Sequence, residues 1–300
     1  MDPYRAQGSV VEDERRPNGK IERALTVFLT GAECPFTCTF CDLWRYTIEG
    51  PTQSGALPGQ LLDVLRQLRE PVPDRIKLYN ASNFFDERAV PSEDIPTIAS
   101  MVSPFRAVTV ESHASTIGRR TLDFARRISG RLELAIGLET IHPTALAQLN
   151  KRLDLPRFDS AARFLAENDI DLRVFVLLGI PGIPPDESAG WTVRTVEYAV
   201  DRGASVVSII PVRGGNGEME RLLDQGQFVP PTLSELENAL DECPRFTSSV
   251  VTVDLWDIER LSRCEHCSTY RIERLRRMNV SGAREPRIDC HICMGRDAIM

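Results

Sequence analysis

The chain has 300 residues and a formal net charge of −7, and 42% of its residues are hydrophobic while 26% are charged. This composition can bury a large core, which excludes a disordered or fibrous protein and a disulfide-stapled miniprotein. The first twenty residues have no apolar stretch, and no later run approaches the ~18 apolar residues of a membrane span. We therefore expect a globular, cytoplasmic protein with no membrane contact, whose clustered cysteines bind metal rather than form disulfides.

Predicted elements alternate along most of the chain. Residues 1–20 are expected to form a polar arm, and residues 21–240 the core, in which β-branched apolar runs alternate with amphipathic stretches, as in repeated βα units. We predict six strands, at residues 24–30, 75–80, 107–112, 132–139, 172–179 and 205–212. Helices are predicted at residues 60–69, 95–101, 121–128, 158–168, 187–201 and 233–240. Periodicity alone fits an open doubly wound sheet or a partial barrel, and either fold binds ligands at the carboxyl ends of its strands.

The pattern changes after residue 240, and residues 241–300 are predicted to form a separate small module. It has one apolar run, at residues 249–255, and then an arginine-rich segment that contains four cysteines. Between Arg260 and Arg287 there are eight arginines and three glutamates, a local charge of +5 that leaves −12 for the rest of the chain. Such a run can bind an anionic partner such as RNA. The interpretation that we favour is that it forms a solvated helix face.

Three cysteines follow the first predicted strand in the segment GAECPFTCTFCDLW. Cys34, Cys38 and Cys41 have C-x3-C-x2-C spacing, and a short loop lets three thiolates converge on one iron–sulfur cluster. Three cysteines leave one iron of a four-iron cluster without a protein ligand, so an external chelator can bind there. The alternatives are a zinc site that takes Cys243 or His113 as its fourth ligand, and a disulfide or inert thiols; the spacing favours the cluster.

The loop CPFTCTFC, with Phe40 before the third cysteine and six βα units after it, resembles the radical S-adenosylmethionine (SAM) enzymes over about residues 24–239. This resemblance implies an α/β fold, a partial (βα)6 TIM-like barrel. It also implies a [4Fe-4S] cluster on the three cysteines, which chelates SAM and cleaves it reductively. The products would be methionine and a 5′-deoxyadenosyl radical that abstracts hydrogen from a substrate, with an electron donor such as flavodoxin or ferredoxin.

Polar residues at the strand ends match the places where that family binds SAM. The segment YNASNFFD stands where the family often has a Gly-Gly-Glu turn, so Asn80 and Ser82 would receive the SAM amino group. By the same resemblance we expect further contacts from Phe40, Glu111, Ser112, Glu139, Arg173 and Gly179. The alternatives are that Asn80 and Ser82 only shape a turn, and that the carboxylates and Arg173 form structural ion pairs.

The motifs VTVES, LAIGLET and GIPGIPP resemble the subgroup of radical SAM enzymes that includes coproporphyrinogen oxidase, the elongator catalytic subunit and the methylthiotransferases. The most similar pattern is that of the radical subunit of archaeosine synthase and its relatives. One position departs from the subgroup, because Phe175 replaces the aspartate that binds the ribose. The resemblance assigns that role here to another residue, such as Glu111.

The tail contains two CxxC pairs, Cys264 with Cys267 and Cys290 with Cys293. Two such pairs can place four thiolates tetrahedrally, so the spacing predicts a metal site, for which zinc is favoured over an auxiliary iron–sulfur cluster. The histidines inside the pairs, His266 and His291, are expected to be exposed neighbours.

Three functional hypotheses follow. The leading one is a radical SAM enzyme of unidentified substrate, for which a modified tRNA nucleoside is one candidate and a small metabolite or peptide is the alternative. Another is a radical SAM enzyme whose arginine-rich tail presents a tRNA. A protein of another class, a non-catalytic iron–sulfur or zinc protein that binds RNA or a partner, is the alternative. Strand-end motifs recognise SAM rather than the substrate, so the sequence does not identify the substrate.

Overall fold

The computed structural model describes residues 1–293 and divides the chain into two compact units. The first unit contains residues 1–14, 21–137 and 151–173. The second contains residues 15–20, 138–150 and the chain from residue 174 onward. The predicted domain boundary at residue 240 stays a prediction, but the tail helix and the residues just before that boundary belong to the same unit.

The strands of the described residues form one sheet whose spatial order is the chain order, β1 to β8. They are β1 (Gly8–Arg15), β2 (Ile21–Phe28), β3 (Arg75–Tyr79), β4 (Ala107–Glu111), β5 (Arg131–Glu139), β6 (Asp171–Leu178), β7 (Ala204–Pro211) and β8 (Val250–Val253). Parallel pairing joins β2 to β3, β3 to β4, β4 to β5, and β7 to β8. A doubly wound sheet reverses its strand order at a switch point, whereas this order is continuous, which confirms the partial-barrel class.

The six predicted strands correspond to β2 to β7. The sequence predicted them because each contains a run of buried apolar residues. The expectation of an arm over residues 1–20 was wrong, since β1 lies within it. Its strand pattern is hidden because Glu12 and Glu14 pair with charged residues rather than entering an apolar core. A hydrophobic alternation is therefore missing from this strand.

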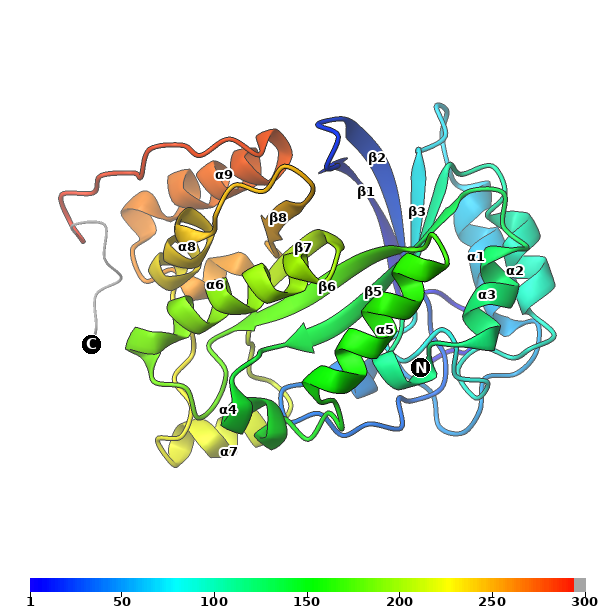
Figure 1. The fold of residues 1–300 in the computed structure, drawn as a ribbon, viewed down its shortest axis with the longest axis horizontal. Coiled ribbons are helices and arrows are strands. Elements are labelled where there is room, and N and C mark those ends of the chain that lie inside the picture. The colour runs from blue at the N-terminus through cyan, green and yellow to red at the C-terminus, as the bar shows by residue number, and fades with distance from the viewer. Residues whose placement is uncertain (294–300) are drawn as a thin grey trace. The chain divides into compact units, whose positions relative to one another are not determined.

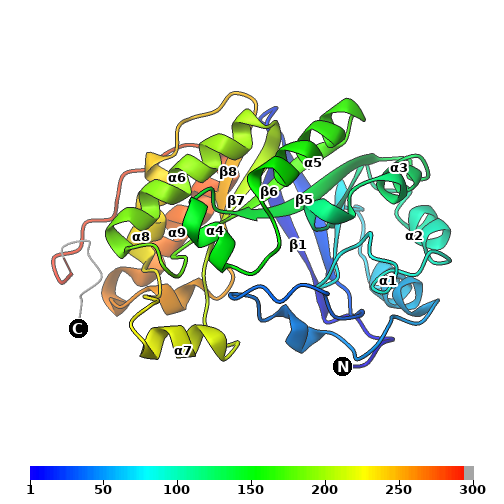
Figure 2. The ribbon, with the colours of Figure 1, turned by 60° about the horizontal axis from the view of Figure 1, so that its bottom comes forward.

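Helices connect the parallel strands. They are α1 (Ala56–Arg66), α2 (Ile95–Met101), α3 (Arg119–Ala125), α4 (Pro143–Gln148), α5 (Leu155–Glu167), α6 (Pro185–Asp201), α7 (Glu218–Asp224), α8 (Leu233–Glu242) and α9 (Glu265–Ser281), with short 3-10 turns η1 (Leu43–Tyr46), η2 (Ala114–Thr116) and η3 (Ile258–Leu261). Within the first unit, α1, α2 and α3 lie side by side (Figures 1 and 2). The sequence did not predict α4, α7 or α9. No helix among residues 1–293 has the length and apolar character that crossing a membrane requires.

The first unit buries a network of charged side chains. Glu133 on β5 is fully buried, and its Oε2 accepts hydrogen bonds from Arg173 Nε at 2.9 Å and Thr109 Oγ1 at 2.9 Å. Arg173 also pairs with Glu14 on β1, and Lys77 Nζ lies 3.1 Å from Glu14 Oε2. Because unpaired buried charges are costly, the network ties β1 to the strands that carry its partners.

The second unit joins α9 to α8 and β8. The ribbons of α8 and α9 lie together in Figure 1. Arg271 on α9 donates to Glu237 on α8 at 2.7 Å and 3.0 Å, and both residues are buried. The side-chain amide of Asn279 accepts from Val253 N at 2.9 Å and donates to Val253 O at 2.8 Å. The helix therefore satisfies backbone groups at the edge of β8.

We predict that Glu133→Gln lowers the free energy of unfolding by about 3 kcal/mol, because removing one partner leaves buried positive charges uncompensated. Urea denaturation measures the change. The matched control is Glu218→Gln on α7, which removes one partner of an exposed ion pair with Arg221 and should change stability little. Equal effects of the two substitutions would contradict a stabilising role for the buried network.

Candidate metal and cofactor site

The three-cysteine loop follows β2, and its cysteines are half-buried. The backbone N–H of Cys41 donates to the carbonyl of Cys38 at 3.0 Å, which closes the turn between these two residues. Burial raises the pKa of Cys34, and it raises the pKa of Cys41 to about 11. Among residues 1–293, the only group of three or more ligand residues whose donor atoms all lie within 4.8 Å is in the tail.

Asn83, which the sequence analysis did not assign to the site, connects the cysteine loop to the end of β4. Its Nδ2 donates to Cys34 Sγ at 3.3 Å, and its Oδ1 accepts from the backbone N–H of His113 at 2.6 Å. The ring of Phe36, in the cysteine loop, stacks on His113 with centroids 4.1 Å apart. No local signal marks Asn83, since Cys34 and His113 are both distant from it in sequence.

His113 is not available as a metal ligand. Its Nδ1 accepts a hydrogen bond from Ser115 N at 3.1 Å, so Nε2 carries the proton and donates to the carbonyl of Lys151 at 3.1 Å. Burial lowers the pKa of His113 to about 4, in keeping with a neutral ring. Because both ring nitrogens are engaged, the alternative of a zinc site completed by His113 is not supported. Cys243 lies in the second unit and is a buried thiol whose pKa is raised to about 12.

Glu111 fixes the turn that follows β3. Its Oε1 accepts hydrogen bonds from the backbone N–H groups of Asn80 at 3.0 Å and Ala81 at 3.1 Å. Ala81 has φ of 53°, in the left-handed region that non-glycine residues seldom adopt, and the carboxylate holds it there. Burial raises the pKa of Glu111 to about 7. Glu111 therefore positions the turn through Oε1, and its predicted contact with SAM stays a prediction.

The same turn presents polar atoms that no described residue satisfies. Asn80 is fully buried, and neither its Oδ1 nor its Nδ2 has a hydrogen-bond partner; Ser82 Oγ is also unpartnered. An unsatisfied buried amide costs free energy, so such a group fits a bound polar ligand. The turn after β3 therefore suits a molecule with donors and acceptors, such as an amino acid group.

Lys151 supplies positive charge to this end of the first unit. Its charge lowers the pKa of Cys34, Cys41 and Glu111, in each case against a larger rise caused by burial. The residues on either side of it, Asn150 and Arg152, have φ of 52° and 57°. Lys151 was not among the predicted contacts, because a single lysine between two helices, α4 and α5, gives no local sequence signal.

Three other predicted contacts have these surroundings. Phe40 is half-buried in the cysteine loop. Ser112 is buried, with its Oγ 2.6 Å from Thr116 Oγ1. Arg173 lies near the beginning of β6, not at its carboxyl end, and pairs with Glu14 and Glu133. Arg173 therefore forms the structural ion pair that the sequence analysis gave as the alternative to a SAM contact.

Two predicted contacts belong to the second unit. Glu139 is buried at the end of β5 with φ of 67°. Gly179 has φ of 79°, and a Cβ there would lie 2.7 Å from the ring of Pro231. Its backbone N–H donates to Ser188 Oγ at 2.9 Å. Glycine is thus required by packing, while the roles of both residues in SAM binding stay predictions.

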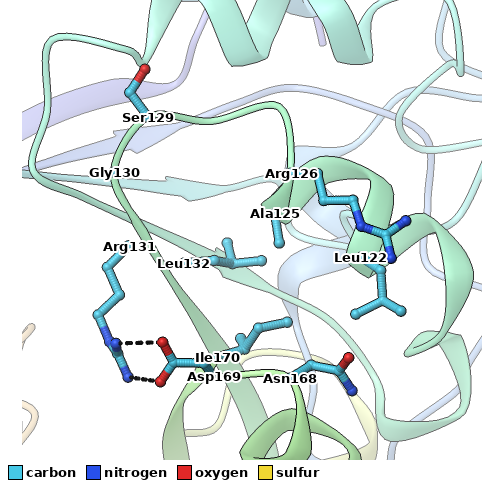
Figure 3. A pocket seen from close by; sticks show the side chains of 10 residues that line it. All are labelled: Leu122, Ala125, Arg126, Ser129, Gly130, Arg131, Leu132, Asn168, Asp169 and Ile170. Atoms are coloured by element: carbon cyan, nitrogen blue, oxygen red, sulfur yellow. Dashed lines mark hydrogen bonds and ion pairs between the residues drawn. The ribbon is translucent and has the colours of Figure 1, made fainter.

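A cavity of about 430 Å³ lies elsewhere in the first unit, between α3, the beginning of β5 and residues 168–170 (Figure 3). Arg131, on its wall, forms two hydrogen bonds with Asp169, of 3.0 Å and 3.2 Å. None of the predicted site residues lines it. The cavity is at the amino end of β5, away from the strand ends where the cysteine loop and the Asn80 turn lie.

The four tail cysteines come together as predicted. Their Sγ atoms all lie within 4.8 Å of one another, an arrangement that can hold a metal ion. Backbone N–H groups of Cys293 and Ile292 lower the pKa of Cys290 to about 6. The rings of His266 and His291 meet edge to face, 5.1 Å apart, and both residues are exposed.

The arginine-rich run is solvated only in part: two of its eight arginines, Arg271 and Arg274, are fully buried, and the other six are exposed. Arg271 pairs with Glu237, and Arg274 pairs with Asp241 at 2.7 Å. Other arginines of the run also pair with carboxylates, namely Arg260, Arg276, Arg277 and Arg287. Much of the local positive charge is therefore neutralised within the protein.

No family model matches this chain, and no curated protein matches it in sequence. Solved structures resemble it in fold. A radical SAM methyltransferase from Sphaerobacter thermophilus is 17% identical with a TM-score of 0.55, and the match covers 85% of this chain and 77% of that chain. SuiB from Streptococcus suis, solved bound to S-adenosylmethionine, is 13% identical with a TM-score of 0.51 over 70% of this chain and 44% of that chain.

The archaeal Elp3 from Methanocaldococcus infernus is 14% identical with a TM-score of 0.51, over 73% of this chain and 57% of that chain. The chain thus spans about half the length of SuiB and of Elp3. At these identities the likeness shows a common fold.

We predict that Glu111 makes stability pH-dependent. Its folded-state pKa of about 7 lies above the ordinary value of 4.5, so the folded chain binds the proton more tightly and loses stability as pH rises from about 4.5 to about 7. Glu111→Gln keeps the Oε1 acceptor without titrating. Thermal unfolding across this range should show a decline in the wild type that the variant lacks, and parallel profiles would contradict the assignment.

Proposed function

We propose that this chain, which has the fold of the radical SAM enzymes, is a radical SAM enzyme. The observation that carries the proposal is the position of three half-buried cysteines after β2, beside a turn whose buried Asn80 amide has no partner among the described residues. In parallel register, Phe28 of β2 lies level with Tyr79 of β3. The cysteine loop and the turn therefore follow neighbouring strand ends.

Cys34, Cys38 and Cys41 would hold the [4Fe-4S] cluster. When bound, the cluster supplies the electron that cleaves SAM to methionine and a 5′-deoxyadenosyl radical, which takes a hydrogen atom from the substrate. Asn83 Nδ2 donates to Cys34 Sγ, which stabilises the thiolate form of that ligand. Phe36, stacked on the neutral His113 ring, covers this part of the loop and limits access of water.

The SAM contacts proposed within the first unit gather round the Asn80 turn. Asn80 and Ser82 would bind polar groups of SAM, because their side-chain atoms are otherwise unsatisfied. Lys151 would pair with its carboxylate, since the positive charge of Lys151 acts on this part of the first unit and lowers the pKa of Glu111 there. Phe40 and Ser112 complete this set. Glu139 and Gly179, from the second unit, are retained as proposed contacts.

A small electron-transfer protein such as flavodoxin or ferredoxin would provide the electron. The substrate is proposed only as a molecule that gives up a hydrogen atom. A tRNA substrate held by the arginine-rich tail draws little support from the contacts there, because Arg271 and Arg274 are buried in ion pairs. A small metabolite or a peptide is as compatible with the cysteine loop and the Asn80 turn as a tRNA nucleoside is.

The decisive experiment is anaerobic reconstitution with iron and sulfide, followed by reduction in the presence of SAM. We expect release of 5′-deoxyadenosine and methionine, measured by chromatography and mass spectrometry. Cys38→Ala should abolish both products and the cluster absorbance. Cys243→Ala, a buried thiol outside the proposed site, is the matched control and should retain both. An iron-replete wild type that leaves SAM intact would favour the non-catalytic iron–sulfur protein.

Lys151→Met should weaken SAM binding by about 10- to 100-fold, the loss expected for one hydrogen bond to a charged group. Calorimetric titration of the reconstituted protein measures the dissociation constant. Arg152→Met is the control, because this exposed neighbour carries the same charge. Equal weakening by the two substitutions would indicate a general electrostatic effect instead of a carboxylate contact.

A further inference from the structure

The four tail cysteines gather around a single point. Cys264 and Cys267 stand at the beginning of α9, and Cys290 and Cys293 at the end of the described chain. Cys264 Sγ lies 3.9 Å from Cys290 Sγ, and Cys267 Sγ lies 3.6 Å from Cys293 Sγ. Three of the four residues are buried, and each is at most 7% exposed.

These separations fit one ion. A tetrahedral Zn²⁺ with Zn–S bonds of about 2.3 Å sets its sulfur ligands about 3.8 Å apart. In a two- or four-iron cluster the thiolates are divided among different irons, so all four cannot be so close together. We infer that Cys264, Cys267, Cys290 and Cys293 hold a single zinc ion and not a second iron–sulfur cluster.

Zinc is preferred over a single iron because a site of this kind binds Zn²⁺ more tightly than Fe²⁺. The described donor set is complete without either histidine, since the four Sγ atoms already supply the four ligands that Zn²⁺ takes in structural sites. The site also lies in the second unit, apart in sequence from the cysteine loop of the first. The inference therefore does not depend on the proposed function.

The ion would clamp the last described segment to α9. Residues 282–293 form no helix or strand, so they lack the backbone hydrogen bonds of regular structure. Arg274 on α9 holds the near end by donating to the carbonyls of Glu285 at 2.7 Å and Pro286 at 2.9 Å. The thiols of Cys290 and Cys293 are the far anchor, and the metal would join them to Cys264 and Cys267 at the beginning of the same helix.

The test of metal identity uses the full-length chain with Cys34, Cys38 and Cys41 all replaced by alanine, so that the first site cannot contribute iron. Elemental mass spectrometry should find about one zinc ion per chain, and a sulfide assay should find none. Adding Cys264→Ser and Cys290→Ser should remove the zinc. Iron with sulfide, iron alone, or no metal would each overturn the inference.

If the serine variant does not fold, Co²⁺ provides a second measurement. Metal-stripped protein with the triple alanine substitution should give the visible absorption of tetrahedral tetrathiolate cobalt, and Zn²⁺ should displace it. A six-coordinate cobalt spectrum would contradict the four-thiolate site. Neither readout requires enzyme activity, so failure of this inference and failure of the proposed function are distinguishable.

The clamp is tested by limited trypsin digestion of the same zinc-loaded chain. Removing zinc with a chelator should speed cleavage after Arg287 at least about tenfold, because the far anchor of the segment is released. Cleavage after the exposed Arg66 on α1 is the internal control and should not change. Equal rates after Arg287 with and without zinc would overturn the clamping role.

Discussion

A single carboxylate organises the candidate site. Glu111 ends β4 and accepts two backbone hydrogen bonds from the turn after the neighbouring strand, which holds Ala81 in a left-handed conformation. This turn contains the unpartnered Asn80 amide, and it is followed by Asn83, which donates to Cys34 Sγ. Without this acceptor, the N–H groups of Asn80 and Ala81 would lose their partner and the turn would lose its conformation. The geometry available to a ligand thus depends on one half-buried acidic group.

Both units place ion pairs where an apolar interior would be expected. Glu133, Arg173 and Glu14 occupy the first unit, while Arg271 and Glu237 occupy the second. Such pairs stabilise the fold only when every charge has a partner. Packing that contains them therefore tolerates fewer substitutions than an apolar core does. The paired charges come from distant parts of the chain. Several arginines that composition alone would assign to binding an anionic partner are therefore paired with carboxylates inside the protein.

The same feature explains what the sequence could and could not predict. Strands β2 to β7 were predictable because each buries a local apolar run, and both cysteine motifs were predictable because their spacing is short. Strand β1 and helix α9 were missed because charged residues fill their buried faces. Asn83 escaped notice because its partner Cys34 is 49 residues away. Contacts of that range are set by strand register, which periodicity does not reveal.

Asn279 on α9 gives the tail a second structural role, at the edge of β8. Its side-chain amide hydrogen-bonds to the N–H and the carbonyl of Val253, as the backbone of a further strand would. A shortened chain that ended before α9 would leave that border of the sheet bare and open to strand addition by another molecule, which invites self-association. Helix α9, which begins at the first cysteine pair of the tail, thus also closes this edge of the sheet at Val253.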